Sequence, residues 1–239
     1  MFRTKITKDE VNQMPVVLFE GKITLVDDLS KIQPAIAELR KNNVVGIDTE
    51  TKPSFTRGTY HKVSLVQIST LDHCFLFRLN KIDFPAALAE FLSDENIKKI
   101  GLSLRDDLNG LNKHHAFKPA NCVDIQTIVQ SYGILELGLQ KIYAILFGKK
   151  ISKSQRLTNW ENAELTEQQQ RYAATDAWAS LQIYLQLMTE EKLTKKQLDK
   201  ILLQNALEQR EQREQRELRE QQALNNQILN QQNDAAAQQ

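Results

Sequence analysis

The sequence lacks the features of a membrane-spanning or disulfide-stapled protein. Its two cysteines, Cys74 and Cys122, each lie in an apolar run, which is typical of buried free thiols in a reducing compartment. No run of about 18 apolar residues occurs, so a membrane span is not supported. Residues 1–10 are polar and charged and have no apolar core of a secretory signal. We therefore expect a cytoplasmic protein.

An excess of charge of one sign is lacking too. Lysine and arginine total 31 against 30 acids, for a formal net charge of +1. This balance neither demands nor excludes binding of nucleic acid. Basic residues near an acidic metal cluster would offset the charge of the cluster and leave the net charge close to zero. The four histidines have no metal-ligand spacing with a cysteine or with one another. Surface or structural roles are therefore expected for them.

Short apolar runs alternate with helix-like segments along the first 190 residues. Extended segments or strands are expected at 15–20, 22–26, 44–48, 63–69, 74–79, 97–102 and 122–124. Helices are expected from about 27 or 30 to 40, and at 84–92, 106–115, 125–132, 137–147 and 166–188. A loop with Pro53 and Gly58 is expected at 51–61. This order predicts an α/β domain with a mixed sheet.

The composition changes near Thr189, which predicts a globular domain over 1–190 and a polar Gln/Glu/Arg-rich tail over 191–239. The stretch 207–219 consists of good helix formers, with Arg210 and Glu214 at i,i+4 spacing. No apolar residue stands between Leu207 and Leu218, so a coiled-coil seam would be interrupted. We expect a solvated helix that frays into disorder; a helix for self-association is the alternative.

Two pairs of residues at regular spacing predict a cation site. Asp48 and Glu50 end an apolar strand and share one face, because side chains at i and i+2 of a strand point the same way. Tyr172 and Asp176 share one face of a helix. Hard divalent cations such as Mg²⁺ prefer carboxylate oxygen and water.

Further motifs occur in a fixed order along the chain. They are Gly46-Ile47-Asp48-Thr49-Glu50, Val63-Ser64-Leu65-Val66-Gln67-Ile68, Ile100-Gly101-Leu102-Ser103-Leu104-Arg105-Asp106-Asp107, Lys153-Ser154-Gln155 with Asn159-Trp160-Glu161, and Tyr172-Ala173-Ala174-Thr175-Asp176. Over roughly residues 20 to 190 this series resembles the DEDD superfamily of 3′→5′ exonucleases. The similarity is to the branch with tyrosine in its last motif, which includes ribonuclease D and Werner-type exonuclease domains.

The resemblance implies a ribonuclease H-like fold, a mixed sheet flanked by helices, and hydrolysis of the terminal phosphodiester at a 3′ end. Nucleoside monophosphates would be released from a nucleic acid with a free 3′ end. By position Asp48 matches the acid that bridges two metal ions, with Glu50 as its strand companion and Asp176 as the last acid. Tyr172 matches the residue that orients the attacking water.

The second-motif acid is one of two neighbours. The family's spacing from Gly101 leads to Asp107, and Asp106 would then be a helix N-cap or a first-turn acid.

Two cations about 3.5–4 Å apart can stabilise the attacking and leaving oxygens of an in-line displacement. Crowded carboxylates raise one another's pKa, and bound cations reverse that penalty. Four acids without histidine favour two Mg²⁺ or Mn²⁺ ions over Zn²⁺.

Substrate contacts are expected around the acids and in a basic loop. Thr49 and Thr51 flank the acids, and Phe55 could stack on a base. Lys149, Lys150, Lys153 and Arg156 could contact phosphates, and Lys153 matches a family position. Gln67 matches a family position but is interpreted equally well as a structural hydrogen-bonder in a strand. Trp160 is interpreted as a packing anchor rather than as a base-stacking platform.

Two other classes of function are open to a chain of this kind. One is a catalytically weak nucleic-acid-binding or scaffold protein with an exonuclease fold, which predicts loss of at least one carboxylate. The acids are all present in the sequence. The other is an interaction module whose Gln-rich tail recruits partners.

Overall fold

The computed structural model describes residues 1–56, 58 and 60–237, the side chains of 224 and 226–237 excepted. The chain divides into two units, Met1–Lys192 and Leu193–Gln239. Both cysteines are free thiols, Cys74 buried and Cys122 half-buried. Within the described ranges, no helix is both long enough and apolar enough to cross a membrane.

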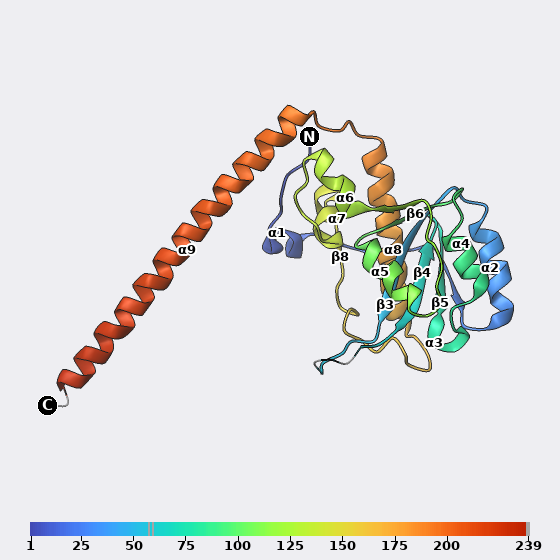
Figure 1. Ribbon diagram of the computed structural model, residues 1–239, viewed down its shortest axis with the longest axis horizontal. Helices are drawn as coiled ribbons and strands as arrows, with labels where there is room; N and C mark the ends of the chain where they lie inside the picture. Colours follow the sequence, from blue (N-terminus) through green and yellow to red (C-terminus); the bar gives the residue numbers. More distant parts are fainter. Residues whose placement is uncertain (57, 59, 238–239) are drawn as a thin grey trace. The chain divides into compact units, whose positions relative to one another are not determined.

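A six-stranded mixed sheet forms the centre of the first unit (Figure 1). Its order is β2 (Lys22–Val26), β5 (His73–Arg78), β4 (Val63–Ser69), β3 (Val44–Thr51), β6 (Lys98–Gly101) and β7 (Cys122–Asp124). Strands β3, β4 and β5 are antiparallel neighbours, whereas β2 and β5, β3 and β6, and β6 and β7 are parallel. The mixed sheet and the hairpin of β4 and β5 confirm the predictions.

Strand β3 sits inside the sheet and is three residues longer than the predicted strand at 44–48. It pairs with β6 only over Val44–Gly46, since β6 ends at Gly101. Its second half pairs with β4 alone, with Asp48 opposite Gln67 and Glu50 opposite Leu65. Beyond Gly46, the edge of β3 that faces β6 has no strand partner among the described residues, which leaves space there for a helix.

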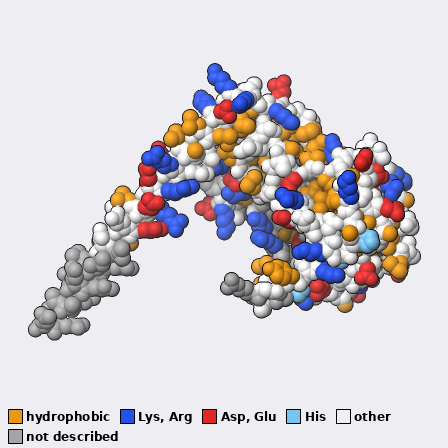
Figure 2. Space-filling view, in the orientation of Figure 1, with side chains coloured by type: hydrophobic (Ala, Val, Ile, Leu, Met, Phe, Trp, Pro, Cys, Tyr) orange, Lys and Arg blue, Asp and Glu red, His pale blue; other side chains and the backbone are white. Residues whose placement is uncertain are grey.

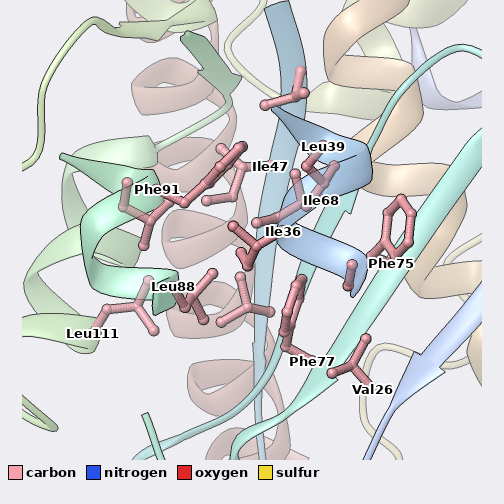
Figure 3. Packing of buried hydrophobic residues seen from close by; sticks show 14 of the residues in the cluster. Val26, Ile36, Leu39, Ile47, Ile68, Phe75, Phe77, Leu88, Phe91 and Leu111 are labelled. Carbon is pink, nitrogen blue, oxygen red and sulfur yellow. The ribbon is translucent and has the colours of Figure 1, made fainter. Parts of the chain in front are cut away.

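Alternation along β3 separates the core residues from the acids. Val45 and Ile47 are fully buried in the cluster beneath helices α2 (Ile32–Leu39), α4 (Ala86–Leu92) and α5 (Leu104–Asn112) (Figure 3). The short α3 (Leu79–Ile82) adds to this layer, and the 3₁₀ turn η1 (Leu29–Lys31) leads into α2. Because side chains alternate in a strand, Asp48 and Glu50 point to the opposite face.

The long helix α8 (Glu167–Met188) covers that opposite face. Thr166 begins it with a capping box to Gln169, which satisfies backbone N–H groups at the helix start. Helix α7 (Leu139–Phe147), the short α6 (Ile125–Ile128) and the 3₁₀ turn η2 (Val129–Tyr132) pack beside it. The predicted helix at 125–132 is thus an α-helical turn followed by a 3₁₀ turn.

An N-terminal segment packs on α7 in a way that the polar composition of residues 1–10 did not predict. Thr7 and Glu10 form a capping box that starts helix α1 (Lys8–Gln13). Strand β1 (Val16–Val17) then pairs in parallel with β8 (Lys150–Ile151). The stretch predicted as a basic loop therefore contains strand β8. This strand is only two residues long, so it shows no alternation of apolar and polar residues in the sequence.

The second unit is a single helix, α9 (Lys195–Ala237). Ion pairs join Arg210 to Glu214 at 2.8 Å and Arg216 to Glu220 at 2.7 Å on its exposed surface. The helical part of the predicted tail is confirmed. Residues 238 and 239 lie outside the described residues, and disorder of the tail and its self-association stay predictions.

Candidate active site

Close packing of α8 on β3 sets the position of the site. A Cβ atom on Gly46 would lie 1.9 Å from the carbonyl oxygen of Ala177, so only glycine permits this approach. The facing side chains of α8 are small and fully buried at Ala173, Ala174 and Ala177. Asp176 precedes Ala177, and it is therefore held against the part of β3 that carries Asp48.

Three carboxylates from β3 and α8 converge. Asp48, Glu50 and Asp176 each offer an oxygen, and these oxygens all lie within 4.8 Å of one another. Burial, followed by the charges of Asp107, Asp176 and Glu50, raises the pKa of Asp48 well above its usual range. Burial and the charges of Asp176 and Asp107 raise the pKa of Glu50 to about 9. Such a cluster fits a divalent cation, whose charge would offset the repulsion.

Tyr172 and Asp176 face the same site from adjacent turns of α8. The Tyr172 hydroxyl acts on the Asp176 carboxylate and opposes the effect of burial on the Asp176 pKa; that pKa still rises to about 7. Burial and the neighbouring acids raise the pKa of Tyr172 above its ordinary value. The phenol therefore stays protonated and can act as a hydrogen-bond donor rather than as a base.

Asp107 approaches from α5, past the end of β6. The Thr49 hydroxyl donates a 2.5 Å hydrogen bond to its carboxylate, and the pKa of Asp107 rises to about 7, chiefly through burial. Its oxygens are not part of the group within 4.8 Å, but its charge acts on both Asp48 and Glu50. Asp106 is exposed in the same helical turn, which favours Asp107 as the site acid.

A pocket of about 390 Å³ opens over Asp48 and Asp176, whereas Glu50 and Asp107 are not among its described lining residues. Asp48, Tyr172 and Asp176 line it together with two cationic side chains, Lys153 and Arg156. The charge of Lys153 lowers the pKa of Asp176, and that of Arg156 lowers the pKa of Glu50. The pocket thus places positive charge beside the carboxylates, where phosphate oxygens would bind.

The other predicted substrate residues lie in different places. The Thr49 hydroxyl is engaged with Asp107, and Thr51 ends β3. Phe55 is 82% exposed in the loop after β3. Among the described residues lining the pocket, neither Thr51 nor Phe55 occurs. Trp160 is fully buried, which confirms its role in packing.

Sequence reasoning missed several residues that shape the pocket, including Ser103, Gln126 and Gln140. Asp124, at the end of β7, accepts from the backbone N–H of Ser103 at 3.1 Å and of Gln126 at 3.0 Å. Ser103 has a left-handed backbone with φ of 57°, so this contact fixes the start of α5. An Asp before a helix is the N-cap signal that could have identified Asp124.

Fold and site together define a ribonuclease H-like domain with an acidic cluster whose geometry fits a divalent cation. Residues 23–192 match the sequence model of a family described as 3′-5′ exonuclease. The chain belongs to this family, and the resemblance to the DEDD exonucleases is confirmed. By family, residues 23–192 form a 3′-5′ exonuclease domain.

Three comparisons place the chain further. It is 26% identical to the exonuclease mut-7 homolog of Aedes aegypti over 215 residues, 80% of this chain and 29% of that protein. It is 31% identical to the bifunctional 3′-5′ exonuclease/ATP-dependent helicase WRN of Mus musculus over 186 residues, 74% of this chain and 13% of that protein. The Escherichia coli RNase D structure is 25% identical with a TM-score of 0.63, covering 70% of this chain and 44% of that one. The chain thus spans less than half the length of each of these three proteins.

Proposed function

We propose that the chain is a metal-dependent 3′→5′ exonuclease that hydrolyses terminal phosphodiester bonds of DNA or RNA and releases nucleoside monophosphates. The convergence of Asp48, Glu50 and Asp176 beside Tyr172 is the observation that carries this proposal. Family membership supports the reaction class.

Asp48, Glu50, Asp107 and Asp176 would hold two Mg²⁺ or Mn²⁺ ions. When bound, the ions supply charge neutralisation at the phosphate and acidify a bound water. Oxygen-only ligands in a half-buried cluster suit these cations. The carboxylates must be ionised to bind them, so cation binding would release protons from the groups with raised pKa.

The chain's own side chains would position the reactants. Tyr172, kept protonated by its raised pKa and oriented by Asp176, would hydrogen-bond the attacking water. The water oxygen would bond to phosphorus and lose a proton to solvent, while the bond to the 3′ oxygen of the preceding nucleotide breaks and that oxygen takes up a proton from solvent. Lys153 and Arg156 would bind the phosphate oxygens, and Thr51 and Phe55 would contact the terminal nucleotides from the strand end and the loop.

The alternative, a catalytically weak binding or scaffold protein, has less support. It predicts a missing acid, and each of the four acids is present with a raised pKa beside the others. The result that would distinguish this alternative is oligonucleotide binding without hydrolysis.

Two unbridged cysteines are consistent with a reducing cytoplasmic location.

A digestion of matched DNA and RNA oligonucleotides, labelled at the 5′ or the 3′ end, tests the proposal. With Mn²⁺ we expect a ladder from the 5′ label and a mononucleotide from the 3′ label, both abolished by a chelator. Asp107→Asn should remove activity, whereas Asp106→Asn, its exposed neighbour, should retain it. Equal activity of these two variants, or degradation that persists in Asp48→Ala, would contradict the assignment.

A further inference from the structure

A second hollow, of about 740 Å³, adjoins the active-site pocket. We call it the lysine groove, because Lys8, Lys141, Lys150 and Lys153 line it and no carboxylate does among the described lining residues. The groove and the pocket share a continuous wall formed by Gly138, Gln140, Ile151, Ser152 and Lys153. The groove therefore lies next to the pocket that Asp48 and Asp176 line.

The outer wall of the lysine groove is the N-terminal segment, which precedes the residues matched by the exonuclease family at 23–192. Ile6 and Val11 are buried against Ala144 of α7. The Lys150 N–H donates to the carbonyl oxygen of Pro15 at 2.9 Å, next to the pairing of β1 with β8. Figure 1 shows α1 beside α7 and β8. The wall is thus packed and hydrogen-bonded in place.

The four lysines are not equivalent. Lys141 forms an ion pair with Glu136 at 3.0 Å, so its charge is largely compensated. Lys150 is directed by a 2.5 Å hydrogen bond to the carbonyl oxygen of Asn12, which leaves its charge uncompensated. Lys8 and Lys153 are exposed and have no ion-pair partner in the described part of the chain. Figure 2 shows Lys and Arg side chains on the part of this face where α1 and β8 lie in Figure 1.

We propose that the lysine groove binds the backbone phosphates of single-stranded nucleic acid on the 5′ side of the nucleotide being removed. The inference rests on the proposed exonuclease function, since it places the 3′ terminus at the acids. A strand held there must leave the pocket, and the lysine groove adjoins the pocket and carries charge that complements phosphate. Lysine contacts to phosphate supply affinity that does not depend on sequence. The N-terminal segment would thereby extend the substrate site beyond the family's domain.

Salt-dependent binding of the full chain to a fluorescent 12-nucleotide single strand tests this inference. Each lost phosphate contact should reduce the slope of log K against log salt by about 0.7, or about fivefold in affinity at 0.1 M salt. Lys8→Gln with Lys150→Gln should therefore weaken binding about 25-fold. Lys113→Gln with Lys118→Gln, which removes equal charge at exposed positions outside the groove lining, should leave the slope unchanged.

A second assay separates this proposal from the exonuclease function. A dinucleotide is too short to extend along the lysine groove, so its hydrolysis should be equal in the parent and in Lys8→Gln/Lys150→Gln. KM for the 12-mer should rise with the loss of affinity. Because Lys150 also contacts α1, Lys8→Gln alone should show about half the slope change, with an unchanged Tm. An inactive parent would refute the nuclease function, and an unchanged salt slope in the lysine variants would overturn the groove.

Discussion

The hydroxyl of Thr49 donates a 2.5 Å hydrogen bond to the carboxylate of Asp107 and so joins β3 to the first turn of α5. Thr49 lies between Asp48 and Glu50 in the strand, but its side chain points to the other face. The same strand therefore supplies two acids directly and orients a third through its intervening residue. This contact lowers the pKa of Asp107 against the larger effect of burial.

Removing the Thr49 hydroxyl should weaken cation binding more than it weakens the fold. Thr49→Val keeps the shape but leaves Asp107 without its donor, which should cost about 1 kcal/mol of unfolding free energy. The Mn²⁺ concentration for half-maximal hydrolysis should rise severalfold, whereas Thr49→Ser should resemble the parent. Metal titrations of activity, with Tm as a folding check, measure both effects. An unchanged metal dependence in Thr49→Val would show that Asp107 needs no such support.

Loss of the Tyr172 hydroxyl should slow turnover without weakening binding. In Tyr172→Phe the water would lose its orienting partner, and we expect kcat to fall about 100-fold with little change in KM. Steady-state kinetics on a 12-mer measure both constants. Tyr184→Phe on the same helix, which removes a hydroxyl bonded to Lys98, is the matched control. Equal kcat in Tyr172→Phe and the parent would remove the water-orienting role.

The sequence predicted the sheet, its long covering helix and the site acids because each leaves a local signal. Apolar β-branched runs identified β3 and β4. The i,i+2 spacing paired Asp48 with Glu50, and the i,i+4 spacing paired Tyr172 with Asp176. The capping residue Thr166 preceded α8 where the prediction put its start. These features depend on residues near each other in the chain.

Features that depend on distant packing could not be predicted. Helix α1 is held by burial of Ile6 and Val11 against α7, and β8 exists because Val16 and Val17 pair with it. The Thr49 side chain was expected near a nucleotide, but its hydroxyl donates a hydrogen bond to Asp107. This contact requires α5 to pass the end of β6. The spacing of residues in the sequence does not show which distant segments pack together. For this reason the sequence predicted only a basic loop where the structure has the lysine groove.

The contact of α8 with β3 makes Gly46 intolerant of a side chain. Gly46→Ala would place a methyl group 1.9 Å from the Ala177 carbonyl oxygen, and α8 would have to shift. We expect at least about 3 kcal/mol of destabilisation, together with lost activity as Asp176 moves from Asp48. In Gly138→Ala, the added methyl group meets nothing within 4 Å, so stability should change little. Denaturant unfolding compares the two, and similar stabilities would contradict the tight contact.

The acidic cluster should make the metal-free protein less stable as the pH rises. The pKa values of Glu50, Asp107 and Asp176 rise to about 9, 7 and 7 from ordinary values of 4.5, 3.8 and 3.8. A raised folded-state pKa means that the folded chain binds these protons more tightly. Their stabilising effect is complete below about pH 4 and is lost as the pH rises through 7 to 9.

Divalent cations should reverse this loss. At pH 8, Mn²⁺ at 100 times its Kd should stabilise the chain by about 2.7 kcal/mol, and by less at pH 5, where protons compete. Thermal unfolding with and without Mn²⁺ measures the difference. Asp48→Asn should flatten the pH dependence and the response to Mn²⁺. A metal-free protein whose Tm is constant from pH 5 to 9 would argue against the raised pKa values.

Gln67 lies opposite Asp48 in the sheet and is fully buried, yet neither amide atom has a hydrogen-bond partner. An unpaired buried amide costs about 1–3 kcal/mol, so Gln67→Leu should raise the free energy of unfolding by about 1 kcal/mol. Gln169 is a buried glutamine with partners, since its Nε2 donates to the Thr158 hydroxyl at 3.0 Å. Gln169→Leu should therefore destabilise the protein by about 1–3 kcal/mol. If both variants lose stability equally in urea unfolding, the Gln67 amide is hydrogen-bonded in solution, and the prediction fails.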